Sequence, residues 1–171
     1  RLGLMFQPTE EVSYYAAYGT SFNTSGDLYQ FDPTSANTPP ESSRNFEIGA
    51  KWELYDGDLS LRTALARTDK FNERNTDIDT ATNSYLLSGK RHTDALEFEI
   101  AGRITPNWDV FAGVGFLRAV IDQSGSNPAG QAEVGQNPGL SPSRQANLWT
   151  TYRLDERWRI GGGLTAVSQN K

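Results

Sequence analysis

Residues 45–70 read NFEIGAKWELYDGDLSLRTALARTDK, and this stretch decides the fold. Apolar residues occupy every second position from Phe46 to Leu54, with polar, charged or small residues between them. Such alternation is typical of a strand with one apolar and one polar face. An Asp-Gly turn signal follows at 56–57, and the alternation resumes at Leu59. The stretch predicts an antiparallel hairpin whose strands are each about ten residues long, which is the length at which a tilted strand crosses a bilayer.

The same unit recurs on both sides of this hairpin. Short turns are expected at 8–11, 55–58, 105–107 and 155–157, and long polar loops at 23–44, 71–91 and 123–140. Connections that alternate between short and long are typical of outer-membrane barrels, whose two rims differ in this way. The pattern predicts an all-β chain with about eight long antiparallel strands, forming a segment of a transmembrane β-barrel.

The composition narrows the class of protein. The net charge is −5 and the pI is near 4.9, which argues against nucleic acid as a partner. The chain has no Cys, so it has neither disulfides nor thiolate metal sites. The mean hydropathy of −0.60 does not argue against a membrane, because a transmembrane barrel shows only half of its side chains to lipid.

Aromatic residues gather near the expected short turns, as in the interfacial girdle of a membrane barrel. They are Tyr14, Trp52, Tyr55, Trp108, Tyr152 and Trp158. A soluble β binding or adhesion module would also alternate, but its strands are typically about five or six residues long. A general porin or a complete small barrel of about eight strands remains a second alternative.

Several hairpins resemble one family. The stretch at 45–70, together with GKRHTDALEFEIAGRITPNWDVFAGVGFL from Gly89 and PSRQANLWTTYRLDERWRIGGGL from Pro142, resembles consecutive hairpins of TonB-dependent siderophore receptors. VSYYAAYGTSF from Val12 resembles an earlier strand of the same family. The resemblance covers most of the chain outside the long loops.

The resemblance implies a barrel of about 22 strands that encloses an N-terminal plug. It also implies a bacterial outer-membrane location in a lipid bilayer. The implied activity is uptake of a ferric siderophore, driven by the TonB complex acting on the plug. We find no plug, no energy-coupling segment and no closing aromatic strand in the sequence. We therefore expect residues 1–171 to be a partial receptor barrel without the plug domain.

The parity of the alternation divides the side chains between two environments. Those expected to face lipid are Phe46, Ile48, Leu96, Phe98, Ile100, Val110, Val114 and Leu148; those expected to face the lumen are Glu47, Lys51, Arg62, Glu97, Glu99 and Arg103. Glu97 and Glu99 could serve as an acid–base pair, but lining the lumen beside Lys51, Arg62 or Arg103 is the favoured reading. No catalytic residue is expected.

Recognition is expected at the loop mouths, because aromatic and cationic groups suit an anionic, aromatic ferric chelate. The candidates are Tyr29, Phe31, Phe71, Arg74, Tyr85, Arg91 and His92. His92, the one His of the chain, is a weak metal ligand candidate and is expected to be a solvated loop residue. No resident metal or cofactor is expected, and the ferric siderophore is the transported ligand.

The ends of the pattern do not match each other. The first strand starts at Arg1, and the last reaches Ser168 without a closing aromatic residue. The glycines on the expected lumen face suit a wide, gently curved wall better than a small filled barrel. We therefore expect an open sheet whose edges, at 1–7 and 159–168, pair with strands elsewhere in the intact protein.

Overall fold

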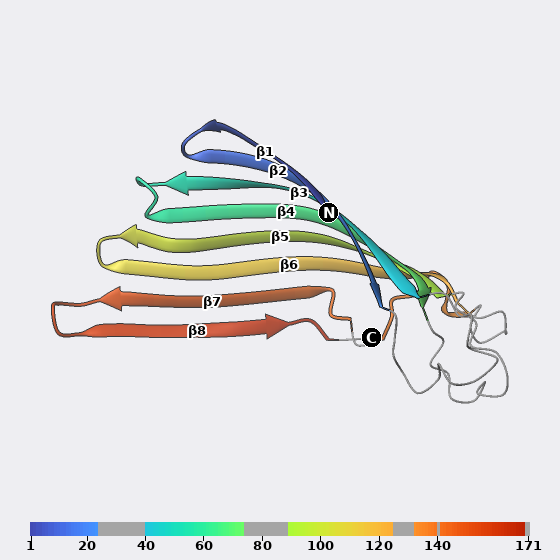
Figure 1. The fold of residues 1–171 in the computed structure, drawn as a ribbon. Helices are drawn as coiled ribbons and strands as arrows, with labels where there is room; N and C mark the ends of the chain where they lie inside the picture. The colour runs from blue at the N-terminus through green and yellow to red at the C-terminus, as the bar shows by residue number, and fades with distance from the viewer. Residues whose placement is uncertain (24–39, 74–88, 125–131, 140, 170–171) are drawn as a thin grey trace.

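The fold is a single antiparallel sheet. The computed structural model describes residues 1–23, 40–73, 89–124, 132–139 and 141–169. The strands are β1 (Leu2–Thr9), β2 (Val12–Asn23), β3 (Glu41–Leu54), β4 (Leu59–Glu73), β5 (Gly89–Thr105), β6 (Trp108–Gln123), β7 (Arg144–Arg153) and β8 (Arg159–Val167). Each strand pairs with the next one along the chain, from β1 to β8 (Figure 1).

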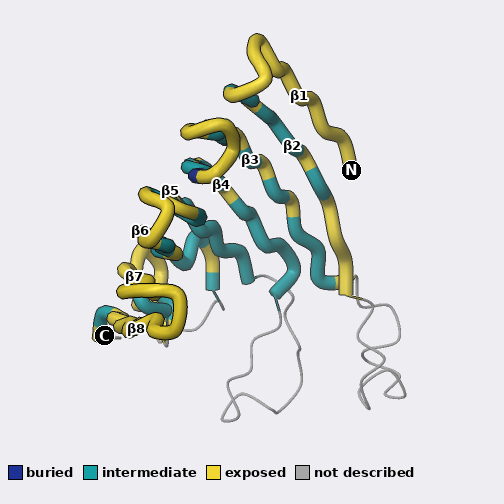
Figure 2. Tube along the Cα trace, turned by 90° about the vertical axis from the view of Figure 1, so that its left-hand side faces the viewer, coloured by how far each residue is buried: buried dark blue, intermediate teal, exposed yellow. Residues whose placement is uncertain are grey.

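The sheet is curved, and its two rims differ. The four short turns lie together at one end of the strands (Figure 1). Seen from that end, the strands follow one another along an arc (Figure 2). Within the described residues, β1 and β8 do not pair with each other. The expectation of an open sheet is confirmed, and the complete small barrel is not what this chain forms.

The strands extend further toward the long connections than the sequence pattern predicts. β3 begins at Glu41, β4 continues to Glu73, and β5 begins at Gly89. The predicted loops at 23–44 and 71–91 are therefore too long. The strand ends near these connections are polar, so apolar and polar residues do not alternate there. Their backbones still pair, as Ser43 does with Lys70.

The registers confirm the division into two faces. Ile48 pairs with Leu65, which in turn pairs with Leu96 of β5. One residue along, Glu47 pairs with Ala66, and Ala66 pairs with Ala95. Since partners in a ladder point to the same side, every residue expected on the apolar face lies on one side, and every residue expected on the polar face lies on the other.

The sheet has almost no core of its own. Ala50 and Leu59 are the buried hydrophobic residues among those described, whereas Phe46 is 52% exposed and Leu65 is also 52% exposed. A β-sandwich would cover such a face with a second sheet. Among the described residues, no second sheet covers this face. No helix among the described residues is long and apolar enough to span a membrane.

The short-turn rim carries the expected aromatic residues. Trp108 pairs with Tyr152, and the Trp108 Nε1–H donates a hydrogen bond of 2.7 Å to the Thr150 hydroxyl. Tyr14, Trp108 and Tyr152 lie near strand ends beside the short turns and are 40–45% exposed, whereas Tyr55 and Trp158 lie in the turns and are more exposed. Such amphipathic rings suit the interface between hydrocarbon and water.

Close approach across the polar face requires glycine at position 49. A Cβ on Gly49 would lie 2.5 Å from Tyr15 Cζ, because the Tyr15 ring crosses from β2 over the β3 backbone. We expect Gly49→Ala to destabilise the folded protein by about 1–3 kcal/mol, the usual cost of overpacking. A denaturant titration that unfolds the whole protein in lipid measures the change in the free energy of unfolding.

Gly162→Ala is the matched control, since no atom lies within 4 Å of a Cβ at that position. The double variant Tyr15→Ala/Gly49→Ala should recover most of the loss caused by Gly49→Ala. Equal stability of the Gly49 and Gly162 variants would contradict the steric explanation.

Candidate functional site

The polar face carries a cluster of ionisable side chains at mid-height. The Tyr15 hydroxyl of β2 donates a hydrogen bond of 2.6 Å to Glu47 Oε1 of β3. Glu47, Glu97 and Arg62 line one depression of about 330 Å³ together with Tyr15. Alternation places these groups side by side, because each strand contributes every second residue to this face. The sequence pattern placed the three charged residues on this face. It did not single out Tyr15, although the position of Tyr15 in the alternation of β2 puts it on the same face.

Of the three cations expected beside Glu97 and Glu99, Arg62 contacts one of these glutamates. Arg62 Nη1 lies 3.8 Å from Glu99 Oε1 across the β4–β5 ladder. Lys51 instead pairs with Glu53 on its own strand. Arg103 Nη2 pairs with Asp58 Oδ1 of the β3–β4 turn at 2.5 Å. The expectation that the glutamates lie beside Lys51, Arg62 or Arg103 is therefore confirmed by Arg62, whereas the other two cations contact different carboxylates.

A second charged cluster occupies the polar face at the rim of the long connections. Lys70 Nζ lies 3.1 Å from Glu73 Oε1 and 3.7 Å from Glu41 Oε2. Arg91 Nη2 also contacts Glu73 Oε1. Asn72 has φ of 55°, and the register shifts between Lys70 and Glu73, which returns Glu73 to the same face as its partners. This cluster of Glu41, Lys70, Glu73 and Arg91 lies at the mouth of the polar face.

The structure describes three of the seven predicted ligand contacts. Phe71 lies in β4, and Arg91 and His92 lie in β5, so their placement in a loop is wrong. Arg91 is on the polar face, whereas Phe71 and His92 are on the apolar side of the sheet. Tyr29, Phe31, Arg74 and Tyr85 lie outside the described residues.

Phe71 already has cationic neighbours within the sheet. The Arg44 guanidinium carbon lies 4.9 Å from the ring centroid, and Lys90 Nζ lies 5.4 Å from it. Both distances fall within the range of cation–π contacts. Phe71 thus joins three strands at the rim, since Arg44 comes from β3 and Lys90 from β5.

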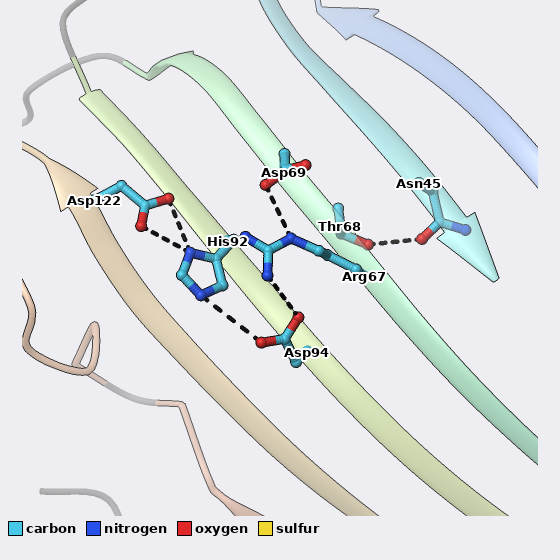
Figure 3. A network of polar contacts seen from close by, with 7 residues as sticks. All are labelled: Asn45, Arg67, Thr68, Asp69, His92, Asp94 and Asp122. Carbon is cyan, nitrogen blue, oxygen red and sulfur yellow. Dashed lines mark hydrogen bonds and ion pairs between the residues drawn. The ribbon is translucent and has the colours of Figure 1, made fainter.

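His92 is part of a hydrogen-bonded network rather than a solvated loop residue. Its Nδ1 lies 2.8 Å from Asp122 Oδ1, and its side chain is only 15% exposed (Figure 3). Asp94 lies on the other side, 3.8 Å from His92 Nε2 and 3.2 Å from Arg67 Nη1. Within the described part of the chain, no group of His, Asp or Glu is arranged to hold a metal ion.

The whole chain matches one family model. Residues 1–171 match the model described as TonB dependent receptor-like, beta-barrel. The chain is 31% identical over 169 residues to the probable TonB-dependent receptor BfrD of Bordetella pertussis. It is also 31% identical over 175 residues to the probable TonB-dependent siderophore receptor PiuA of Acinetobacter baumannii. These matches cover 95% and 94% of this chain but only 22% and 23% of the relatives.

Solved structures show the same arrangement of strands. The crystal structure of the siderophore receptor PiuA from Acinetobacter baumannii superposes with a TM-score of 0.82 at 29% identity, covering 96% of this chain and 25% of that one. The ferric-catecholate import receptor Fiu from Escherichia coli, in its closed form, superposes with a TM-score of 0.75 at 28% identity. That match covers 98% of this chain and 25% of Fiu. The curved open sheet therefore corresponds to about a quarter of each larger receptor chain.

Proposed function

Because this chain belongs to the TonB-dependent receptor β-barrel family, we propose that it is part of an outer-membrane receptor that takes up ferric siderophores. The family comprises receptors and transporters rather than enzymes. The observation that carries the proposal is the match to siderophore receptors across 94% or more of the chain, in sequence and in fold. The polar and apolar faces support it independently, since they suit a sheet between lipid and an aqueous interior.

The proposed partners lie on the polar side. A plug elsewhere in the protein would occupy the lumen against the mid-height cluster of Tyr15, Glu47, Arg62 and Glu97, and would connect to the TonB complex. The ferric siderophore would enter from the rim of the long connections. Arg91 is the best-supported of the candidate contacts, because it combines a cationic group with a position on the polar face at that rim.

The function is tested in the organism that makes the protein. Deletion of the whole receptor gene should abolish growth on at least one ferric catecholate, hydroxamate or mixed chelate as the only iron source, and the wild-type gene should restore it. The purified receptor should bind the same chelate, measured by quenching of its tryptophan fluorescence. Unchanged growth on every chelate, together with no binding, would overturn the proposal.

Replacing Arg91 should weaken the chelate affinity. Removing one charge-assisted contact costs roughly 1.5–3 kcal/mol, so Arg91→Gln should raise the Kd about tenfold or more. Arg159→Gln is the control, because Arg159 lies at the opposite rim of the same sheet. Fluorescence quenching measures both affinities. An equal change in the two variants would remove Arg91 from the site.

The orientation predicts which rim faces the outside of the cell. Val134 is exposed in the long β6–β7 connection, and Glu156 is exposed in the short β7–β8 turn. In intact cells, a membrane-impermeant maleimide should label Val134→Cys, and it should label Glu156→Cys only after permeabilisation. The 171 residues contain no other Cys to interfere. Labelling of Glu156→Cys alone in intact cells would invert the orientation.

A further inference from the structure

The apolar side of the sheet ends in a belt of charged residues. The belt consists of Arg44, Arg67, Asp69, His92, Asp94, Arg118, Asp122 and Arg144. All eight share the parity of the apolar face. Arg67 pairs with Phe46, and Phe116 pairs with Arg144, so the belt begins where the apolar band stops, at the rim of the long connections.

The belt marks a level in the membrane. Charged groups on the lipid side of a barrel are costly at mid-bilayer, and that cost falls close to zero near the interfaces. An apolar band that ends in eight polar residues therefore meets the hydrocarbon along the band and the headgroups along the belt. Because the belt lies at the rim of the long connections, the headgroups concerned belong to the outer leaflet in the proposed orientation.

The carboxylates of the belt are satisfied within the protein. Arg67 Nε lies 3.4 Å from Asp69, and Arg67 Nη1 lies 3.2 Å from Asp94 (Figure 3). Asp122 accepts its contact from His92. Each of the three aspartates thus contacts Arg67 or His92, either on its own strand or on the neighbouring one. Among the described residues, every carboxylate of the belt therefore has a basic partner.

Of the four arginines in the belt, Arg67 is ion-paired and Arg44 lies over the Phe71 ring, whereas the other two have no such partner among the described residues. Arg118 of β6 and Arg144 of β7 are both exposed, and neither has an ion-pair partner among the described residues. Asp94 is opposite Arg118 in the ladder, but its oxygens contact Arg67 and His92. Arg144 pairs with Phe116, which places it diagonally beside Arg118 on the same face. Arg118 and Arg144 therefore extend from neighbouring strands on the same face, and neither has an acidic partner among the described residues.

We propose that Arg118 and Arg144 bind the phosphate of a lipid headgroup in the outer leaflet. Guanidinium groups bind phosphate through paired hydrogen bonds that an ammonium group does not reproduce. The apolar band directly below, at Phe116, Val114 and Leu148, would hold the acyl chains of the same lipid. This proposal rests on the membrane location proposed above and is independent of siderophore uptake.

The test uses the whole receptor in phosphatidylcholine nanodiscs that contain lipid A, a phosphorylated glycolipid. Native mass spectrometry after release counts the lipid A molecules that stay bound. Arg118→Gln/Arg144→Gln should bind lipid A about tenfold more weakly, as expected for losing a charge-assisted contact. The matched control is Arg153→Gln/Arg159→Gln, which removes the same charge from a directly paired arginine pair at the short-turn rim.

Several outcomes separate the possibilities. Dephosphorylated lipid A should bind the wild type as weakly as lipid A binds the double variant. Arg118→Lys/Arg144→Lys should restore only part of the binding, because lysine keeps the charge but not the paired donors. An equal loss in the control pair would overturn the proposal. Complete displacement by inorganic phosphate would also overturn it, because the site would then take a free anion. Circular dichroism of each variant verifies that the barrel is folded.

Discussion

Phe98→Arg should destabilise the intact receptor in lipid by about 2–4 kcal/mol, the expected cost of a cationic side chain that faces lipid near mid-bilayer. Phe98 lies in the middle of β5, is 45% exposed, and pairs with Thr63 and Val114 on the apolar face. Among the described residues, no carboxylate on that face lies at this height, since the charged belt begins on β5 only at Asp94. Reversible denaturant unfolding in phospholipid vesicles measures the change.

The neighbouring residue supplies the control. Glu99 points to the polar face and lies 3.8 Å from Arg62, and both side chains are substantially exposed. Exposed ion pairs contribute about 1 kcal/mol or less, so Glu99→Gln should cost much less than Phe98→Arg. Equal losses for the two variants would mean that the faces have been assigned incorrectly.

The second large effect concerns the edges of the sheet. Within the described residues, β1 and β8 each lack a partner on their outer side. Unpaired backbone N–H and C=O groups cost several kcal/mol each in hydrocarbon. We therefore expect residues 1–171 alone to aggregate or remain unfolded in detergent micelles, whereas the whole receptor folds.

Heat-modifiable migration in gel electrophoresis and far-ultraviolet circular dichroism distinguish the two results. The whole receptor should migrate faster when unheated, as a folded barrel does, and the 171-residue chain should not. A monomeric, heat-modifiable form of the isolated chain would contradict the prediction and would require β1 and β8 to find partners within the same chain.

The strand pattern could be predicted from the sequence because hydrophobic alternation and register carry the same information. A shift of one residue would turn Ile48 and Phe98 to the polar side, so the apolar band admits only one parity. The turn at 55–58 was also predictable. It needs positive φ at Tyr55, Asp56 and Gly57, and an Asp-Gly step is a strong turn signal.

The strand ends near the long connections could not be predicted in the same way. Beyond Phe46 the apolar face of β3 carries Arg44 and Ser42, so the alternation that identifies a strand disappears while the backbone ladder continues. His92 was misplaced for this reason, and so was Phe71. Their partners, Asp122 and Arg44, come from neighbouring strands, and no pattern within a single strand shows such contacts.

Paired strand residues hold the two ends of a long connection together. Asn23 pairs with Glu41, and Glu73 pairs with Gly89, so the β2–β3 and β4–β5 connections each start and end on a fixed register. Doubling the length of a flexible loop costs only about 0.6 kcal/mol in closure entropy. Insertions, deletions and recombination between these anchor pairs can therefore vary the two connections while the ladder below keeps its pairing.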